Sequence, residues 1–200
     1  SAMADEGKST IAYNLALSLS IKNKRVVLID CDLKNPSIGK ICGLPEEHKG
    51  LTEYLKGEAD LMECVQKENS QSLYIIARGK PVEESTELLM GVKMKKLIEA
   101  IKEEMDYVII DSPPSAMLTD AAIIAEHIDA AIYVVRQDYS KASSIVEGLE
   151  RLSDSGISIL GCILNEAEAG LSSYGGYNRY GSYGRYSSKY YYGHKENNTD

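Results

Sequence analysis

A glycine, a lysine and a serine follow one another near the start of the chain, in the order that phosphate-binding loops use. They lie in the segment 2–10, which fits a Walker A loop with alanine in the first glycine position. In such a loop, backbone N–H groups surround the phosphates and the start of the next helix adds partial positive charge. We expect Lys8 to neutralise phosphate charge and the Ser9 hydroxyl to bind Mg²⁺. The predicted nucleotide-binding residues of the loop are Asp5, Glu6, Gly7, Lys8, Ser9 and Thr10.

Three aspartates follow two short apolar runs that read as buried strands. Asp30 and Asp32 come after one run, and Asp111, in the Walker B position, ends the other. Ligands of parallel sheets bind at the carboxyl ends of strands, so the three carboxylates should converge near the γ-phosphate. Asp32 and Asp111 could hold Mg²⁺, and the remaining Asp30 could accept a proton from an attacking hydroxyl. The alternative for each aspartate is helix capping or a solvated loop.

Eight tyrosines stand near the other end of the chain, in a segment rich in glycine and serine. With so little aliphatic surface, this segment cannot offset the entropy of ordering itself, and we predict a flexible tail over residues 166–200. We favour a cluster of phosphorylation sites, and the alternative is a low-complexity segment used for association. The tyrosines are Tyr174, Tyr177, Tyr180, Tyr183, Tyr186, Tyr190, Tyr191 and Tyr192.

Strands and helices must alternate along residues 1–165 to position these groups. The predicted strands are residues 25–30, 73–76, 107–111, 130–135 and 157–164. The predicted helices are residues 9–24, 90–105, 119–128 and 143–153. This alternation predicts an α/β domain of the P-loop NTPase type, a mostly parallel sheet with helices on both faces. A strand normally precedes such a loop, and we expect this first strand to lie upstream of Ser1.

Composition excludes several classes of function. The net charge of −8 argues against nucleic acid as a partner. The four cysteines show no zinc-binding spacing, which favours a reduced compartment. The sequence contains no uncharged apolar run long enough to span a membrane.

The motifs together resemble those of the bacterial tyrosine kinases (BY-kinases) of capsule and exopolysaccharide synthesis. The Walker A loop is followed by an A-prime motif at residues 28–32, a Walker B strand at 108–114 and the tyrosine cluster. The likeness covers essentially the whole chain. The tyrosine tail is its most specific element, because related ATPases lack it.

This resemblance implies a protein-tyrosine kinase that uses ATP and Mg²⁺, autophosphorylates its tyrosine cluster in trans, and regulates capsular or exopolysaccharide synthesis and export. Lys8, Asp30, Asp32 and Asp111 would be catalytic, with Asp30 activating the tyrosine hydroxyl and Ser9, Asp32 and Asp111 at the metal. Asn165 would pair with the adenine edge, and the alternative is a strand-end asparagine in a turn.

The implied partners are sister subunits, a membrane polysaccharide co-polymerase that activates the kinase, and a protein-tyrosine phosphatase. The resemblance places the domain in the cytoplasm, at the inner face of the membrane, through the activator or an upstream segment. Ring assembly is expected where the family's N-terminal helix is intact. Lys34 replaces the usual arginine of the A-prime motif, which keeps the charge but loses the bidentate fork.

Two other functions remain open at this point. A MinD/ParA-type ATPase switch shares the expected fold, but Met3 occupies the position of that class's signature lysine. A scaffold that binds nucleotide without turnover, and associates through its tail, is the non-enzymatic alternative.

Overall fold

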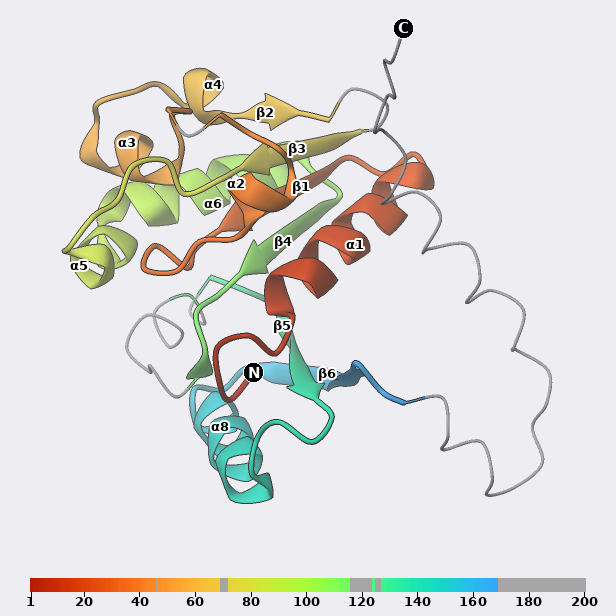
Figure 1. Cartoon of the computed structure of the whole chain (residues 1–200). Helices are drawn as coiled ribbons and strands as arrows, with labels where there is room; N and C mark the ends of the chain where they lie inside the picture. The colour runs from red at the N-terminus through yellow and green to blue at the C-terminus, as the bar shows by residue number, and fades with distance from the viewer. Residues whose placement is uncertain (46, 69–71, 116–123, 125–126, 169–200) are drawn as a thin grey trace, which may run out of the picture. The chain divides into compact units, whose positions relative to one another are not determined.

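Strand β1 (Val26–Asp30) lies at the centre of the larger sheet, and all five of its residues are buried. It pairs in parallel with β3 (Leu73–Ile76) on one side and with β4 (Tyr107–Asp111) on the other. The short strand β2 (Gln66–Lys67) adds antiparallel to β3, which gives the order β2-β3-β1-β4 (Figure 1). The three parallel strands confirm the prediction to within one residue. The two residues of β2 are too few to give a periodic signal.

These elements come from a computed structural model that describes residues 1–45, 47–68, 72–115, 124 and 127–168. The chain divides into two compact units, Ser1–Ala167 and Glu168–Asp200, and the described helices and strands belong to the first. Most of the helix predicted over 119–128 and all eight clustered tyrosines lie outside the described residues. The boundary predicted between residues 165 and 166 therefore stays a prediction.

Helices cover both faces of the larger sheet, as the sequence predicts. The helices are α1 (Lys8–Ile21), α2 (Ile38–Ile41), α3 (Leu51–Lys56), α4 (Leu61–Cys64), α5 (Ser85–Met90), α6 (Val92–Glu104) and α8 (Ala142–Asp154). Helices α1 and α2 lie on one face of the sheet, and α3, α5 and α6 lie on the other (Figure 1). The helix predicted over 90–105 begins two residues late, because Gly91 adopts an extended conformation between α5 and α6.

The alternating side chains of β1 explain these two layers. Val26 and Leu28 pack with Ala16 of α1 in one apolar cluster. Val27 and Ile29 pack in the other cluster, with Leu97 of α6 among their partners. Successive strand residues point to opposite faces, so a run that is apolar at every position must be covered on both sides.

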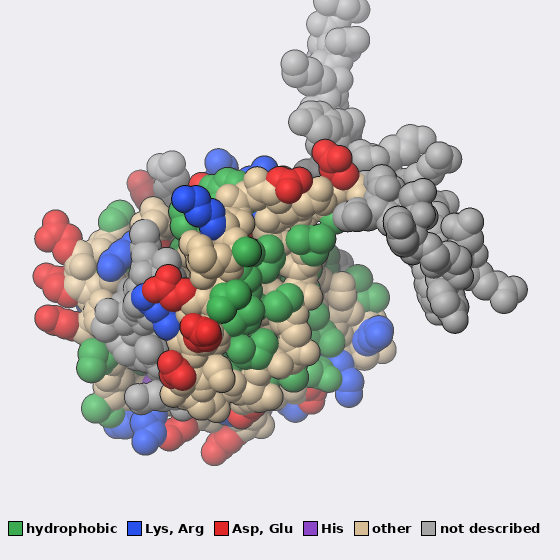
Figure 2. Space-filling model, turned by 90° about the horizontal axis from the view of Figure 1, so that it is seen from below, with side chains coloured by type: hydrophobic (Ala, Val, Ile, Leu, Met, Phe, Trp, Pro, Cys, Tyr) green, Lys and Arg blue, Asp and Glu red, His purple; other side chains and the backbone are tan. Residues whose placement is uncertain are grey.

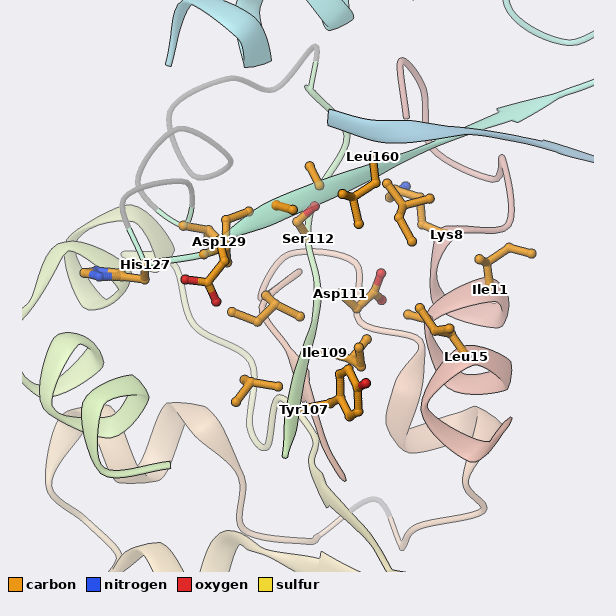
Figure 3. A pocket seen from close by; sticks show the side chains of 18 of the residues that line it. Lys8, Ile11, Leu15, Tyr107, Ile109, Asp111, Ser112, His127, Asp129 and Leu160 are labelled. Carbon is orange, nitrogen blue, oxygen red and sulfur yellow. The ribbon is translucent and has the colours of Figure 1, made fainter. Parts of the chain in front are cut away.

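A second, two-stranded parallel sheet is formed by β5 (Ala130–Arg136) and β6 (Ser158–Asn165). The sequence predicts both strands, but it does not predict that the described strands divide into two sheets. A cleft of about 680 Å³ lies between β4 and β5 (Figure 3). Aliphatic side chains of both sheets and of α1 and α6 line it, among them Ile11, Leu15 and Leu160.

Helix α8 and the second sheet both carry exposed apolar side chains. Val146 of α8 and Leu160 and Leu164 of β6 are each more than half exposed. Figure 2 shows hydrophobic side chains gathered on the side of the molecule where these elements lie. None of the helices in the described ranges has the length and apolar character that a membrane crossing requires.

Gly148 sets how closely α8 approaches β5. A Cβ atom built on Gly148 would lie 2.2 Å from the Tyr133 hydroxyl and 2.5 Å from the Ser115 hydroxyl. The Tyr133 side chain is fully buried, so it cannot relieve such a contact by turning into solvent. We expect Gly148→Ala to lower the free energy of unfolding by about 1–3 kcal/mol through overpacking, although alanine is the better helix former.

The measurement is urea unfolding followed by circular dichroism. Glu150→Ala, at an exposed position of the same helix, is the matched control and should leave stability within about 0.5 kcal/mol of the parent. A Gly148→Ala protein as stable as the parent would show that α8 can move away from β5 at little cost.

Candidate functional site

The loop ahead of α1 leaves its amide groups available to an anion. Helix α1 begins at Lys8 with Gly7 as its N-cap, and no side chain caps the first turn. Gly7 has φ +88°, a left-handed conformation that glycine adopts without steric cost. The uncapped N–H groups of the first turn and the positive end of the helix dipole form an anion site. These features favour phosphate binding at this loop, and the nucleotide contacts of its residues stay a prediction.

Asn165, at the end of β6, lies directly against this loop. Its Nδ2 donates a hydrogen bond to the Glu6 carbonyl over 3.0 Å. A Cβ atom at Gly7 would lie only 2.1 Å from the same Nδ2. Gly7 is thus needed both for its backbone conformation and for the close approach of Asn165. The structure brings Asn165 to the predicted nucleotide site, and its pairing with adenine stays a prediction.

The Glu6 carboxylate accepts hydrogen bonds from its own loop and from the segment after β5. It accepts hydrogen bonds from the Met3 amide at 2.7 Å and from the Ser140 hydroxyl at 2.9 Å. Burial raises the pKa of Glu6, but the hydrogen bonds from Met3, Ser140 and the Arg136 amide outweigh burial and hold the pKa below its usual value. The ionised Glu6 carboxylate therefore links the loop to the segment after β5 through hydrogen bonds.

The three predicted aspartates do converge. Asp30 and Asp111 are direct partners at the carboxyl ends of β1 and β4, and Asp32 follows two residues later. Each is less than a tenth exposed. Both carboxyl oxygens of Asp30 accept backbone N–H groups, from Asp32 at 3.2 Å and Ile38 at 3.1 Å, which fix its orientation.

This arrangement places negative charges close together inside the protein. Burial raises the pKa of Asp30 to about 7, and the charge of Asp111 adds to the rise. Burial also raises the pKa of Asp111 to about 6, against the opposing effects of a hydrogen bond from Ser9 and the charge of Lys8. Two carboxyl groups with raised pKa values next to a phosphate loop are suited to bind a cation and to transfer a proton.

One buried atom of this cluster is left without a partner. The Asp111 Oδ2 atom is buried and has no hydrogen-bond partner in the structure. An unsatisfied carboxylate oxygen beside Ser9 fits a bound Mg²⁺, for which Ser9, Asp32 and Asp111 would be the protein ligands. Within the described ranges, no three acidic, histidine or cysteine side chains could hold a metal by themselves.

Lys8 and Asp111 line one end of the cleft between β4 and β5, and Figure 3 shows them on facing elements, α1 and β4. The aliphatic side chains of α1 and β4 continue the lining away from them. The charged part of the site therefore borders an apolar cleft.

Two residues that bond to the loop, Arg136 and Ser140, were not predicted from the sequence. Ser140 bonds to Glu6, and the Arg136 guanidinium donates to the Asp5 carbonyl over 3.2 Å. More than 130 residues separate these partners along the chain. A polar turn after a strand carries no pattern that predicts such a contact.

The fold and the loop define a P-loop nucleotide-binding domain. Residues 5–156 match the AAA domain family. The MinD cell-division ATPase of Pyrococcus furiosus superimposes with a TM-score of 0.67 at 22% identity, over 80% of this chain and 66% of that one. At that identity the likeness shows the fold alone.

Closer relatives define the branch within this fold. The tyrosine-protein kinase CpsD of Streptococcus agalactiae is 38% identical over 172 residues, which cover 86% of this chain and 75% of CpsD. The VpsO kinase domain superimposes with a TM-score of 0.79 at 31% identity, over 83% of this chain and 81% of that domain. The chain belongs to the family of bacterial tyrosine-protein kinases.

The buried carboxylates predict an unusual dependence of stability on pH. The pKa values of Asp30 and Asp111, about 7 and about 6, lie above the unfolded value of about 3.9. The folded state then binds more protons than the unfolded state between these values. The contribution of the two groups therefore weakens the fold as pH rises from about 4 to about 7.

We expect Asp111→Asn to unfold at a higher temperature than the parent at about pH 8 without divalent cations, with a smaller gain at about pH 5. The asparagine oxygen can still accept the Ser9 hydroxyl, while the repelling charge is gone. The difference in unfolding temperature, followed by calorimetry, cancels groups that titrate equally in both proteins. Asp154→Asn, at an exposed position of α8, should show no such trend. A less stable Asp111→Asn protein at pH 8 would contradict the proposed repulsion.

Proposed function

We propose that this chain transfers the γ-phosphoryl group of ATP to tyrosine hydroxyls, chiefly those of the clustered tyrosines 174–192 on sister subunits. The transfer would regulate the synthesis and export of a capsular polysaccharide or exopolysaccharide. The observation that carries the proposal is the set of buried carboxylates beside the phosphate loop, in a chain that also carries eight clustered tyrosines. The names of the relatives support it.

The protein's own groups would divide the reaction between them. The loop amides and Lys8 hold the phosphates, and Ser9, Asp32 and Asp111 hold Mg²⁺. Bound Mg²⁺ supplies positive charge that offsets the phosphate oxygens during transfer. Asp30 would accept the tyrosine proton, because its pKa of about 7 lies near the pH at which it must work.

The remaining partners follow from the same proposal. Sister subunits would present their tails to one another, with ring-like assembly where the N-terminal helix is intact. A membrane polysaccharide co-polymerase would activate the kinase and hold it at the inner face of the membrane, and a protein-tyrosine phosphatase would reset the tail. Each added phosphate contributes about −1.5 to −2 charge, so a modified tail would be repelled by the acidic site.

The first test maps phosphotyrosine by mass spectrometry after incubation with ATP and Mg²⁺, on assembled protein with the activator's cytoplasmic segment supplied. We expect Lys8→Met to abolish tail phosphorylation, because the phosphates lose their charged partner. Asp30→Asn should slow it by at least about 10²-fold, the usual contribution of a general base.

Lys56→Met, at the exposed end of α3, is the matched control and should phosphorylate at the parent rate. Full activity in Asp30→Asn would reject Asp30 as the base. Unmodified tails in the parent protein, with nucleotide binding intact, would reject the kinase proposal for this chain.

A second test separates two roles of Asn165. If its amide pairs with adenine as well as supporting the loop, Asn165→Ala should weaken ATP binding more than GTP binding. The expected difference is about three- to tenfold, the size of one lost hydrogen bond. Equilibrium binding of both nucleotides in the presence of Mg²⁺ measures it. Equal weakening of ATP and GTP binding would leave Asn165 as a support of the loop alone.

A further inference from the structure

Arg136 joins the nucleotide loop to the residue that follows the last strand. Its Nη1 donates to the Asp5 carbonyl over 3.2 Å, and its Nη2 pairs with the Glu166 carboxylate at 2.6 Å. The guanidinium also lies over the Tyr139 ring, 4.9 Å from the ring centre. One side chain at the end of β5 thus contacts the loop and the chain segment that leads out of β6.

Both residues that Arg136 bonds to have a left-handed backbone conformation. Asp5 has φ +58° and Glu166 has φ +53°, and neither residue is glycine. Such left-handed conformations cost free energy, so they persist where surrounding contacts enforce them. The contacts of Arg136 to the Asp5 carbonyl and to the Glu166 side chain are contacts of this kind.

Other bonds hold the same segments together. The Asn165 side chain donates to the Glu6 carbonyl, and the Asn165 carbonyl accepts the Gln137 amide over 3.0 Å. The Glu6 carboxylate accepts the Ser140 hydroxyl. The ends of β5 and β6 and the nucleotide loop are therefore joined by a continuous set of hydrogen bonds.

We propose that Arg136 is a positioning residue for the nucleotide loop and that Glu166 orients it, so that nucleotide binding is energetically coupled to the backbone that leads into the tail. Glu166 holds Nη2 and thereby keeps Nη1 directed at the Asp5 carbonyl. The proposal rests on nucleotide binding at this loop and does not require tyrosine as the substrate.

The geometry explains why arginine serves at this position. The planar guanidinium presents two nitrogens in fixed directions and can serve the carbonyl and the carboxylate at once, whereas lysine offers a single ammonium. About one third of the Arg136 side chain is exposed, so without Glu166 it can turn toward solvent. A partner that draws the tail away from the domain would then weaken nucleotide binding, and bound nucleotide would in turn hold residues 165–167 more firmly.

The test is a double-mutant cycle on the full chain, read by the dissociation constant of a fluorescent ADP analogue in the presence of Mg²⁺. We expect Glu166→Gln and Arg136→Gln each to weaken binding by about three- to tenfold, the net size of one ordinary hydrogen bond, because the interaction is partly exposed and acts on the loop indirectly. The double variant should bind no more weakly than Arg136→Gln alone, because both changes remove the same interaction. Arg136→Lys should recover only part of the affinity.

Glu147→Gln is the matched control, since it removes a similarly exposed ion pair with Arg151 on α8 and should leave nucleotide affinity unchanged. Parent-like affinity in Glu166→Gln, or strictly additive effects in the double variant, would overturn the coupling. Either result would leave the kinase proposal standing, because the cycle measures binding and not phosphoryl transfer.

A measurement on the unmodified protein covers the case in which a variant fails to fold. By reciprocity, Mg²⁺–ADP should slow amide hydrogen exchange at residues 165–167 as well as in the loop. Slowed exchange in the loop with no change at 165–167 would contradict the proposal.

Discussion

The repulsion between two buried carboxylates is the constraint around which this site is organised. Asp30 and Asp111 end adjacent parallel strands in register, so the sheet itself forces them together. Burial raises the pKa of both groups, and the charge of Asp111 adds to the rise at Asp30. The charge of Asp32 adds to the rise in the pKa of Asp111, and Lys8 and Ser9 offset only part of the effect there. The unpartnered Asp111 Oδ2 leaves a place that a cation can fill. The buried carboxylates therefore cost the fold stability, which a bound cation would restore.

The larger sheet can hold this repulsion because its strands are fixed from both faces. Every residue of β1 is buried, and its apolar side chains, Val26 to Ile29, enter the two apolar clusters in strict alternation. The backbone of Asp30 cannot move apart from Asp111 without disturbing both clusters. The two N–H groups that bond to the Asp30 carboxylate fix its side chain as well. Rigid placement of this kind is what phosphoryl transfer requires, since most of its catalysis comes from positioning and electrostatics.

The nucleotide loop depends on segments far away in the sequence. Its left-handed residues Asp5 and Gly7 are held by contacts from the ends of β5 and β6, through Arg136 and Asn165. The ionised Glu6 carboxylate also accepts a hydrogen bond from the Ser140 hydroxyl, which ties the loop to the segment after β5. The conformation of the phosphate loop thus depends both on the first ten residues and on contacts from the second sheet. Glu166, which contacts Arg136 beside this loop, is also the first residue after β6 in the direction of the tyrosine cluster.

The sequence by itself determined the parallel strands, the helices at 9–24 and 143–153, the phosphate loop and the three aspartates, because these features follow from local spacing and apolar periodicity. It also identified the family, through motifs whose order along the chain is specific. Only the tertiary structure decided that Asn165 lies against Gly7, that Glu6 turns to Ser140 and that Arg136 joins Asp5 to Glu166. It likewise decided that the described strands fall into two sheets with an apolar cleft between them. These features arise from contacts between segments that lie far apart in the sequence. A local sequence pattern cannot predict which distant backbone group a polar side chain will bond to.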